Sequence, residues 1–295
     1  MFIDREITAV ISLGTGDFGE AGKNTVTLEG YRITAGITKG GLPSLDTANI
    51  SIFGLSKSLM NQLTRLGKPL AWPRDNTITL TAGDAESGMS HIFFCTIINS
   101  YSDFEGMPDV SLNLVASSGL LALAKPVTPL SFAAGVDVAT IASRIAESMG
   151  KSFMNSGVTQ RLNGPVYLPG TAVDQLRKLK DTANIDADMN GGPTGETLEI
   201  WPVNKPRGSL IPNISKDSGL IGYPRYSDMG IGIRAIYRPG WVYAGRFNLE
   251  TEITPAAGTW QIISLVYDLE SKTPGGAWFM DIVGARTPED GGSYE

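Results

Sequence analysis

Three short stretches of the chain contain residue types at spacings that could bind a ligand or catalyse a reaction. The first, Gly14 to Gly19, matches the pattern G-x-G-x-x-G of dinucleotide-binding loops and follows a strand-like run at 8–13. Such a loop holds a pyrophosphate only where a helix begins at its glycines, because the helix N-terminus supplies the N–H groups. Here the chain continues into a strand-like run at 25–28, so the pattern predicts a plain loop.

The second stretch contains the only histidine, His91, and the only cysteine, Cys95. Residues four apart on a strand face the same side, but at about 3.3 Å per residue their side chains lie more than about 10 Å apart. That separation is too large for a nucleophile and its base, and a single histidine does not make one of the usual zinc sites. Cys95 stands in the apolar run 92–95 and is expected to be a buried thiol, with no disulfide inside the chain.

The third stretch is acidic. The run 186–191, with Asp186 and Asp188, resembles the first half of a calcium-binding loop. The bidentate acid that such a loop needs is missing, because Thr197 occupies its place and Glu196 comes one residue early. The pattern therefore favours a solvated glycine-rich turn over a calcium site. No pair among the 30 acidic residues is marked out for glycoside hydrolysis, so the sequence identifies no catalytic, cofactor-binding or metal-binding residue.

Composition indicates a folded chain with many turns. Of 295 residues, 42% are hydrophobic and 18% charged, with 35 glycines and 17 prolines, which is typical of strands joined by turns or of a surface covered by partners. The net charge of −6 argues against an electrostatic nucleic-acid binder. The first residues do not resemble a secretory signal, and no run approaches the roughly 20 apolar residues that cross a bilayer, so we expect no membrane segment.

The elements that would position functional residues begin with strands. The first part, residues 1–124, is predicted to be an antiparallel sheet or barrel with one helix, which begins at the N-cap Ser56. Apolar residues alternate with polar ones at 31–37 and at 48–52, on both sides of a short glycine-rich connection. This arrangement predicts a long β-hairpin.

The predicted hairpin has an apolar face and a polar face. The polar face carries small hydroxyl and amide side chains: Thr47, Asn49 and Ser51. The connection between its strands contains Gly40 and Gly41 and is expected to be flexible, without an anchor in the core.

The middle part, residues 125–209, changes to an α+β pattern. Helices are predicted after Asp137 and after Thr171, which begins a capping box in which Asp replaces the usual Glu. The β pattern returns at 210–287, and the polar tail 288–295 is expected to be loose. The predicted fold class is therefore α+β, mainly β, with two antiparallel β units and an α+β insert between them.

Two stretches of the chain resemble a known family. One is the strand 46–56, which reads D-T-A-N-I-S-I-F-G-L-S and runs into a helix. The other combines 232–240, 258–260 and 274–279 with their glycine, proline and tryptophan residues. In order, and over nearly the whole chain, they resemble the baseplate hub proteins of contractile-tailed phages, which are related to phage late control protein D and to the base of type VI secretion spikes. The resemblance implies two tail-tube-like β-barrels.

The resemblance also implies a function and partners. Three chains would form a homotrimeric ring that joins the central spike protein to the tail tube and surrounds the channel for DNA and the tape measure protein, next to other baseplate proteins. Thr47, Asn49 and Ser51, with Gly40 and Gly41, would lie at the channel or at a subunit interface, past which DNA moves without specific binding. The protein would be a structural part of the virion, in the tail baseplate, assembled in the host cytoplasm. The family offers no catalytic residue and no cofactor to carry over.

Other functions stay open on the sequence alone. A tail-tube or distal-tail adaptor would use the same barrel, and a tail-associated cell-wall glycoside hydrolase is the rival from another class. A carbohydrate-binding module would use the aromatic residues that are dense in the last part, such as Tyr223, Tyr226 and Trp241. Their placement in alternating runs favours core packing or a subunit interface instead.

Overall fold

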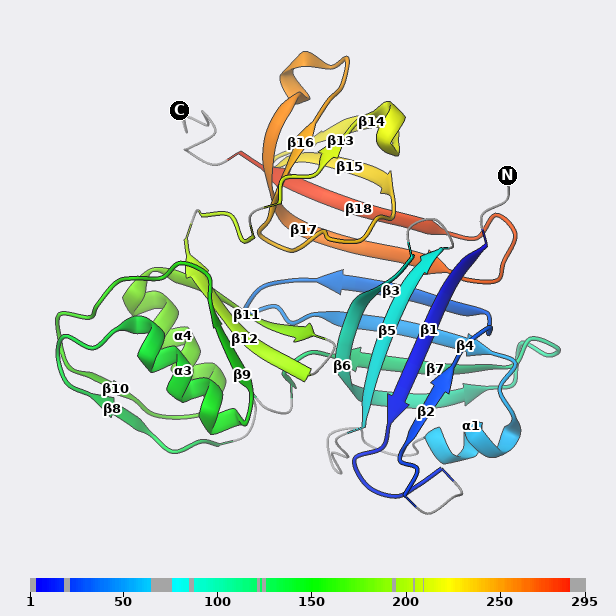
Figure 1. Ribbon diagram of the computed structural model, residues 1–295, viewed down its shortest axis with the longest axis horizontal. Coiled ribbons are helices and arrows are strands. Elements are labelled where there is room, and N and C mark those ends of the chain that lie inside the picture. The colour runs from blue at the N-terminus through cyan, green and yellow to red at the C-terminus, as the bar shows by residue number, and fades with distance from the viewer. Residues whose placement is uncertain are drawn as a thin grey trace.

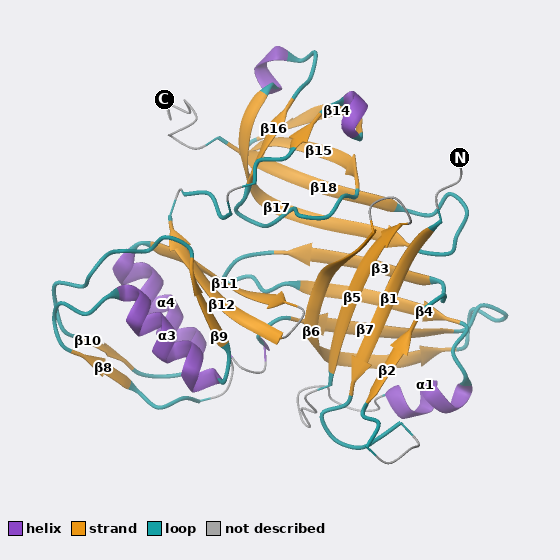
Figure 2. Cartoon of the chain, in the orientation of Figure 1, coloured by secondary structure: helices purple, strands orange, loops and turns teal. Residues whose placement is uncertain are grey.

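The computed structural model describes residues 4–18, 22–64, 76–84, 88–120, 123, 126–192, 195–203, 205–208 and 210–286. Within these residues the chain forms a first β unit, a middle segment (residues 126–208) and a second β unit, which are shown in Figure 1. Strands make up most of both β units, while the two long helices gather in the middle segment (Figure 2). This is the mainly β, α+β fold class that the sequence predicts.

The first β unit is an antiparallel sheet that curves around an apolar core. Its elements are β1 (Arg5–Ser12), β2 (Thr25–Leu28), β3 (Ile33–Lys39), β4 (Thr47–Phe53), α1 (Lys57–Leu63), β5 (Thr77–Asp84), β6 (Gly88–Asp103) and β7 (Ser111–Ser117). In space the strands follow the order β3-β4-β7-β6-β5-β1-β2. The strand β2 is therefore one edge of the sheet.

The strands β3 and β4 form the predicted hairpin. Their apolar residues face one another in three pairs: Ile33 with Ile52, Ala35 with Ile50, and Ile37 with Ala48. All six side chains are at most 1% exposed. Because burying one isoleucine contributes roughly 1.5–3 kcal/mol, this row is a main source of the stability of the unit.

Two local predictions for the first β unit can be compared with the structure. The helix α1 begins at Ser56, whose Oγ accepts the N–H of Leu59 at 3.3 Å, as predicted. Residues 14–18 form the loop between β1 and β2 and contain no helix, which confirms the prediction for that part of the glycine pattern. Gly19 lies outside the described residues.

The middle segment packs two helices between two small sheets (Figure 1). Its elements are β8 (Leu130–Phe132), α3 (Val138–Met149), β9 (Ser152–Asn155), β10 (Val166–Leu168), α4 (Ala172–Ala183), β11 (Ile185–Gly192) and β12 (Gly195–Pro202). One sheet has the order β11-β12-β9 and the other pairs β10 with β8. The segment has an apolar core of its own, built around both helices. None of the helices in the described part of the chain is long and apolar enough to span a membrane.

Both predicted helix starts in the middle segment are confirmed. The helix α3 follows Asp137 and ends at Gly150, which has a positive φ of 68°. At the start of α4 the backbone and side chain of Thr171 exchange hydrogen bonds with Asp174, which completes the capping box.

The second β unit continues the sheet of the first. Its strands are β13 (Asn213–Ile214), β14 (Leu220–Ser227), β15 (Gly230–Ile236), β16 (Arg246–Leu249), β17 (Gly258–Glu270) and β18 (Trp278–Ala285). They follow the order β14-β15-β18-β17, with β16 paired to β17 and β13 to β16. The strand β17 also pairs with β3, so the two β units share one 13-stranded sheet whose main path runs from β14 to β2.

Most aromatic residues of the second β unit pack in its core, as predicted. The following side chains are at most 7% exposed: Tyr237, Trp241, Phe247, Trp260, Tyr267 and Trp278. The ring of Tyr237 makes edge contacts with Tyr267 and Trp278 at centroid distances of 5.3 and 5.6 Å. In contrast to these buried residues, Tyr223 and Tyr226 are 68% and 60% exposed.

The prediction of a solvated turn at 186–191 is wrong. This run lies in β11 and pairs along its length with β12, where Asp188 stands opposite Glu199. Asp188 is only 2% exposed. Gly191 is needed because β11 passes close to β6: a Cβ at this position would lie 2.1 Å from the carbonyl oxygen of Phe94. This glycine therefore reflects a close approach of two backbones.

The prediction that His91 and Cys95 face the same side of a strand is also wrong. Leu80 pairs with Phe93 whereas Thr81 pairs with His91, so β6 contains an extra residue at this point. Such a bulge inverts the alternation of side chains. Cys95 is fully buried in the core, and this burial raises the pKa of its thiol. His91 lies on the opposite side of the strand.

Candidate assembly surfaces and a charged junction

The polar face of the hairpin belongs to a larger surface that both β units share. Across β17, β3, β4 and β7, Asp268 lies opposite Gly36, Gly36 opposite Asn49, and Asn49 opposite Val115. We call the outward side of these four strands the shared sheet face. Of the residues singled out from the sequence, Thr47 and Asn49 are exposed on it and Ser51 is half-buried. Their place at a channel or a subunit interface stays a prediction.

The charged groups on and beside the shared sheet face are paired. Arg234 of β15, which is separated from β17 by β18, lies 3.7 Å from Asp268 of β17 and 3.3 Å from Asp281 of β18. Arg32 at the start of β3 lies 3.0 Å from Glu270. One guanidinium is shared by two carboxylates in the first group, which leaves one negative charge in excess there. The shared sheet face therefore presents little attraction to phosphate groups.

The connection between β3 and β4 is anchored, contrary to the prediction that it lacks a core contact. Leu42 is 6% exposed and packs in the core of the middle segment. Its N–H donates to the carbonyl oxygen of Ala187 at 2.9 Å, and its own carbonyl accepts from Lys180. Gly41 packs against Tyr243 of the second β unit, where an added Cβ would lie 2.5 Å from the ring. The connection thus joins all three parts of the chain.

A buried carboxylate fixes the shape of this connection. Asp46 is 1% exposed and accepts hydrogen bonds from the Nζ of Lys39 at 2.8 Å and from the N–H of Gly40 at 2.9 Å. Its own N–H donates to the Oγ of Ser118 at 3.1 Å. No role for Asp46 is predicted from the sequence, although an acid a few residues after a pair of glycines in a turn is a signal that it binds the turn.

A second buried group holds the chain after β12. Arg207 is 5% exposed and donates to Glu199 and to Asp188, the latter at 2.9 Å. Its N–H donates to the carbonyl oxygen of Ala244 at 2.9 Å, which ties the middle segment to the second β unit. Burial raises the pKa of Asp188 to about 7, with a further contribution from Asp46, despite the opposing effect of Arg207. Among the described residues, no three His, Cys, Asp or Glu side chains are grouped so that they could hold a metal ion.

Two groups of large apolar side chains are exposed at separate places on the surface. Tyr223, Tyr226 and Met229 project from the edge strand β14 and its following turn, and are 68%, 60% and 68% exposed. Phe104 and Met107 in the connection between β6 and β7 are 42% and 73% exposed. In Figure 1, β14 lies at the top and this connection at the right edge. Contiguous exposed apolar groups are candidates for protein contacts; we call these two groups the β14 patch and the β6–β7 patch.

Comparisons with known proteins give a family match and similar structures. A family model described as Baseplate hub gp41 matches residues 8–278. The tail protein from Neisseria meningitidis MC58 is similar in structure, with a TM-score of 0.62 and 11% identity, over 94% of this chain and 96% of that one. The 43 kDa tail protein of prophage MuSo2 from Shewanella oneidensis gives a TM-score of 0.61 and 10% identity, over 96% and 97% of the two chains.

A third similar structure comes from a secretion system. The E. coli c3393 protein is described as a component of the type VI secretion system with structural similarity to the T4 phage tail proteins gp27 and gp5. It matches with a TM-score of 0.60 and 8% identity, over 93% of this chain and 76% of that one. At these identities the three structures show a shared fold. A comparison with curated proteins gave no match.

Proposed function

The chain belongs to the Baseplate hub gp41 family, and we propose that it is a structural, non-enzymatic hub of a phage tail baseplate. Three copies would form a ring that joins the central spike to the tail tube. The observation that carries this proposal is the pairing of β17 with β3, which makes one sheet out of two β units. Each copy then contributes two neighbouring β units, so three copies supply six around the ring.

The domain division that fits this ring is the one expected from the sequence. Residues 1–124 and 210–287 are the two tube-like β-barrel domains, and 125–209 are the α+β insert. The tail 288–295 lies outside the described residues. The insert is held to both β units through Leu42 and Arg207, so it would sit at a fixed position on the ring.

The shared sheet face is our candidate for the wall of the channel. Thr47, Asn49 and Ser51 place hydroxyl and amide groups there, which keep water on the surface. The carboxylates around Arg234 leave a small negative balance that repels DNA phosphates. DNA and the tape measure protein would therefore pass without being bound.

The two apolar patches are our candidates for the contact between neighbouring copies. A head-to-tail contact, in which the β14 patch of one copy meets the β6–β7 patch of the next, closes into a ring when the rotation between copies is suitable. Backbone pairing along β14 is limited by Pro224 and by the irregular register between Ile221 and Arg225. The contact would therefore depend on the exposed side chains.

Mass photometry of the purified protein tests the ring. At micromolar concentration, alone or with the spike protein of the same phage, we expect particles of three copies. The double substitution Tyr223→Asp and Tyr226→Asp should leave the thermal melt unchanged and yield monomers. The matched control is Tyr167→Asp, because Tyr167 is also exposed but lies in the middle segment. A protein that stays monomeric with and without the spike contradicts the proposal, and stacked six-fold tubes would favour a tail-tube adaptor instead.

A digestion assay tests the non-enzymatic part of the proposal. The acidic residues that first suggested chemistry are held in ion pairs, Asp186 with Lys180 at 3.3 Å and Asp188 with Arg207 at 2.9 Å. Host peptidoglycan and surface polysaccharide incubated with the protein should show no release of reducing ends. Release that disappears in the Asp188→Asn protein would favour the glycoside hydrolase.

A further inference from the structure

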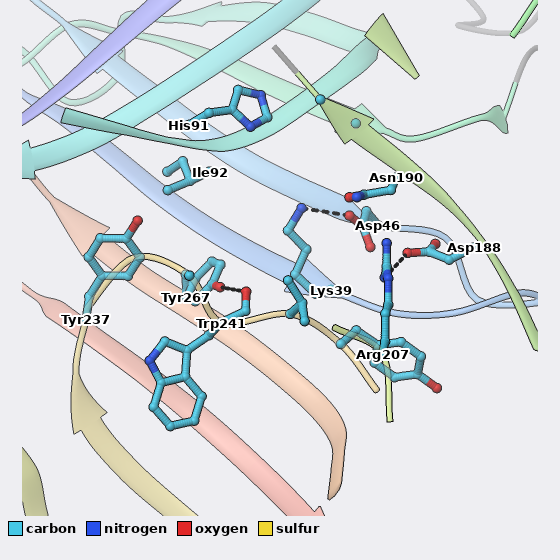
Figure 3. Close-up of a pocket in the computed structure, with 15 residues that line it drawn as sticks. Lys39, Asp46, His91, Ile92, Asp188, Asn190, Arg207, Tyr237, Trp241 and Tyr267 are labelled. Atoms are coloured by element: carbon cyan, nitrogen blue, oxygen red, sulfur yellow. Dashed lines mark hydrogen bonds and ion pairs between the residues drawn. The ribbon is translucent and has the colours of Figure 1, made fainter. Parts of the chain in front are cut away.

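Two buried ion pairs lie at a polar cavity of about 270 Å³, where the two β units and the middle segment meet (Figure 3). Lys39 binds Asp46 at 2.8 Å, and Arg207 binds Asp188 at 2.9 Å. Arg207 also donates to a third carboxylate, that of Glu199. None of these five side chains is more than 13% exposed. We call them the charged junction, and the hub function proposed above does not depend on them.

The charged junction contains more acids than bases. With every group ionised, three carboxylates face one ammonium and one guanidinium, so one negative charge has no counter-charge within the junction. An uncompensated charge is costly to bury. A single proton on one of the carboxylates removes the excess and leaves the junction neutral.

The hydrogen bonds indicate which carboxylate has room for this proton. Both oxygens of Asp46 accept hydrogen bonds, and so do both oxygens of Glu199. Asp188 accepts from Arg207 at Oδ2, whereas its Oδ1 has no hydrogen-bond partner among the described residues. Because Asp188 also lines the cavity, its Oδ1 is the atom that can take up the proton.

The surroundings of Asp188 favour its protonated form. Burial raises the pKa of this carboxyl to about 7, and the negative charge of Asp46 contributes to the rise. The positive charges of Arg207 and Lys39 act in the opposite direction without cancelling it. Asp188 therefore gains or loses its proton near neutral pH.

The other titratable groups around the charged junction do not supply the missing charge. Burial, helped by the charge of Lys39, lowers the pKa of His91, so its imidazole is neutral at pH 7. Burial raises the pKa of four further groups, which are Cys95, Tyr237, Tyr243 and Tyr267. The remaining acids of β11 and β12 are paired with lysines, Asp186 with Lys180 at 3.3 Å and Glu196 with Lys151 at 2.8 Å.

The charged junction lies beside the backbone contacts that attach the middle segment. The N–H of Leu42, in the connection between β3 and β4, donates to the carbonyl oxygen of Ala187, which directly precedes Asp188. The N–H of Arg207 donates to the carbonyl oxygen of Ala244 in the second β unit. A change in the charge of the junction therefore acts on both attachments at once.

We propose that one proton on Asp188 controls how tightly the middle segment is attached to the two β units. With the proton bound, the charged junction is neutral and the attachment is tight. When the proton leaves, one excess negative charge is buried, and the middle segment opens more often.

The direction of the pH dependence follows from the two forms of the chain. In the open form Asp188 is exposed and has the ordinary aspartate pKa of about 3.9, whereas in the closed form its pKa is about 7. The closed form therefore holds the proton more tightly. The contribution of this proton to the attachment is complete below about pH 4, is lost as the pH rises towards 7, and changes little above that.

Hydrogen–deuterium exchange of the full chain from pH 5 to pH 8, corrected for the intrinsic pH dependence of amide exchange, tests the proposal. Protection of peptides that contain Leu42 or Arg207 should fall by up to about tenfold per pH unit between pH 5 and 7, because opening releases one proton, and should level off by pH 8. Peptides from the paired strands β17 and β3 are the internal reference and should keep their protection. Equal protection of the Leu42 and Arg207 peptides at pH 5 and pH 8, or an equal loss in the reference peptides, would overturn the proposal.

Three variants identify the group that carries the proton. Asp188→Asn has no proton to lose, so its protection should not depend on pH and should exceed that of the wild type at pH 8. Asp186→Asn is the matched control on the same strand and should keep the pH dependence of the wild type. Glu199→Gln removes the excess charge but leaves Asp188 in place, so the loss of protection should move to lower pH. An unchanged pH dependence in Asp188→Asn or, where that variant does not fold, in Glu199→Gln contradicts the assignment to Asp188.

Discussion

The second β unit and the middle segment are attached to the first β unit in physically different ways. The second β unit joins through the backbone, since β17 and β3 pair over six consecutive residues from Leu265 to Glu270. The buried Ser271 extends this pairing, because its N–H donates to the carbonyl oxygen of Ile33 at 2.9 Å. The middle segment joins the first β unit through one turn and a few side chains, chiefly Leu42, and it joins the second β unit through Arg207, whose N–H donates to the carbonyl oxygen of Ala244.

The difference has a consequence for how each junction responds to mutation. Backbone hydrogen bonds survive most substitutions, so the sheet junction fails only when the apolar row beneath it is disrupted. A buried ion pair is lost through a single substitution, because removing one partner leaves the other charged and desolvated. We therefore expect the sheet junction to resist single surface changes and the charged junction to depend on single residues.

The largest effect is expected for Ile50→Asp, which places a charge in the apolar row. Ile50 is 1% exposed and lies between Ala35 of β3 and Leu114 of β7. Burying an unpaired carboxylate there should lower the free energy of unfolding by about 4 kcal/mol or more. Melts followed by circular dichroism measure the loss. The neighbouring exposed change Asn49→Asp is the control, and an equal loss in both would mean that the two faces are not distinct.

The same comparison explains which parts of the fold could be predicted from the sequence. Alternation at 31–37 and 48–52 predicted the hairpin. Side chains of a strand alternate between its two faces, so only one pairing register buries all the apolar residues on the same face. The alternation of apolar and polar residues gives no sign of the bulge at Ile92 or of the close approach at Gly191. They depend on contacts with strands that a local pattern does not identify.

The buried ion pairs of Asp46 and Asp188 were not predicted, although both acids had been noted in the sequence. Asp188 was considered as part of a calcium loop, and Asp46 as the first residue of a family pattern. Asp188 pairs with Arg207, which lies 19 residues further on beyond β12, and spacing along the chain carries no information about this pair. Asp46 pairs with Lys39 across the turn between β3 and β4. Local sequence reasoning thus identified unusual acids but could not pair them.

The second largest effect is expected for Arg207→Met, which keeps the volume and removes the charge. Asp188 and Glu199 would then be buried without a cation, which should cost about 3 kcal/mol. Limited proteolysis should show that the middle segment becomes accessible before the β units do. Adding Asp188→Asn and Glu199→Gln to this variant should recover most of the stability. No recovery would mean that Arg207 acts by packing against Trp201, over which its guanidinium lies at 5.1 Å.

A smaller effect is expected for Leu42→Ala in the anchored connection. The substitution leaves the backbone bonds to Ala187 and Lys180 in place and removes only the buried side chain, so we expect a loss of about 2 kcal/mol in urea unfolding. Ser44→Ala, two residues on and exposed, should change little. A Leu42→Ala protein as stable as the wild type would restore the earlier expectation of an unanchored turn. Deletions around Gly40 should be at least as destabilising as Leu42→Ala.

The smallest effect on stability is expected for Asn49→Arg on the shared sheet face. Asn49 is exposed in the chain, so the free energy of unfolding should change by no more than about 0.5 kcal/mol. In the proposed ring the same change adds a positive charge from every copy to the channel wall, so assembled particles should retain double-stranded DNA in a salt-dependent manner. Filter binding measures the retention, with Asn49→Gln as the neutral control. A large loss of stability would mean that another part of the chain covers this face, and unchanged DNA retention by intact rings would mean that the face lies away from the channel.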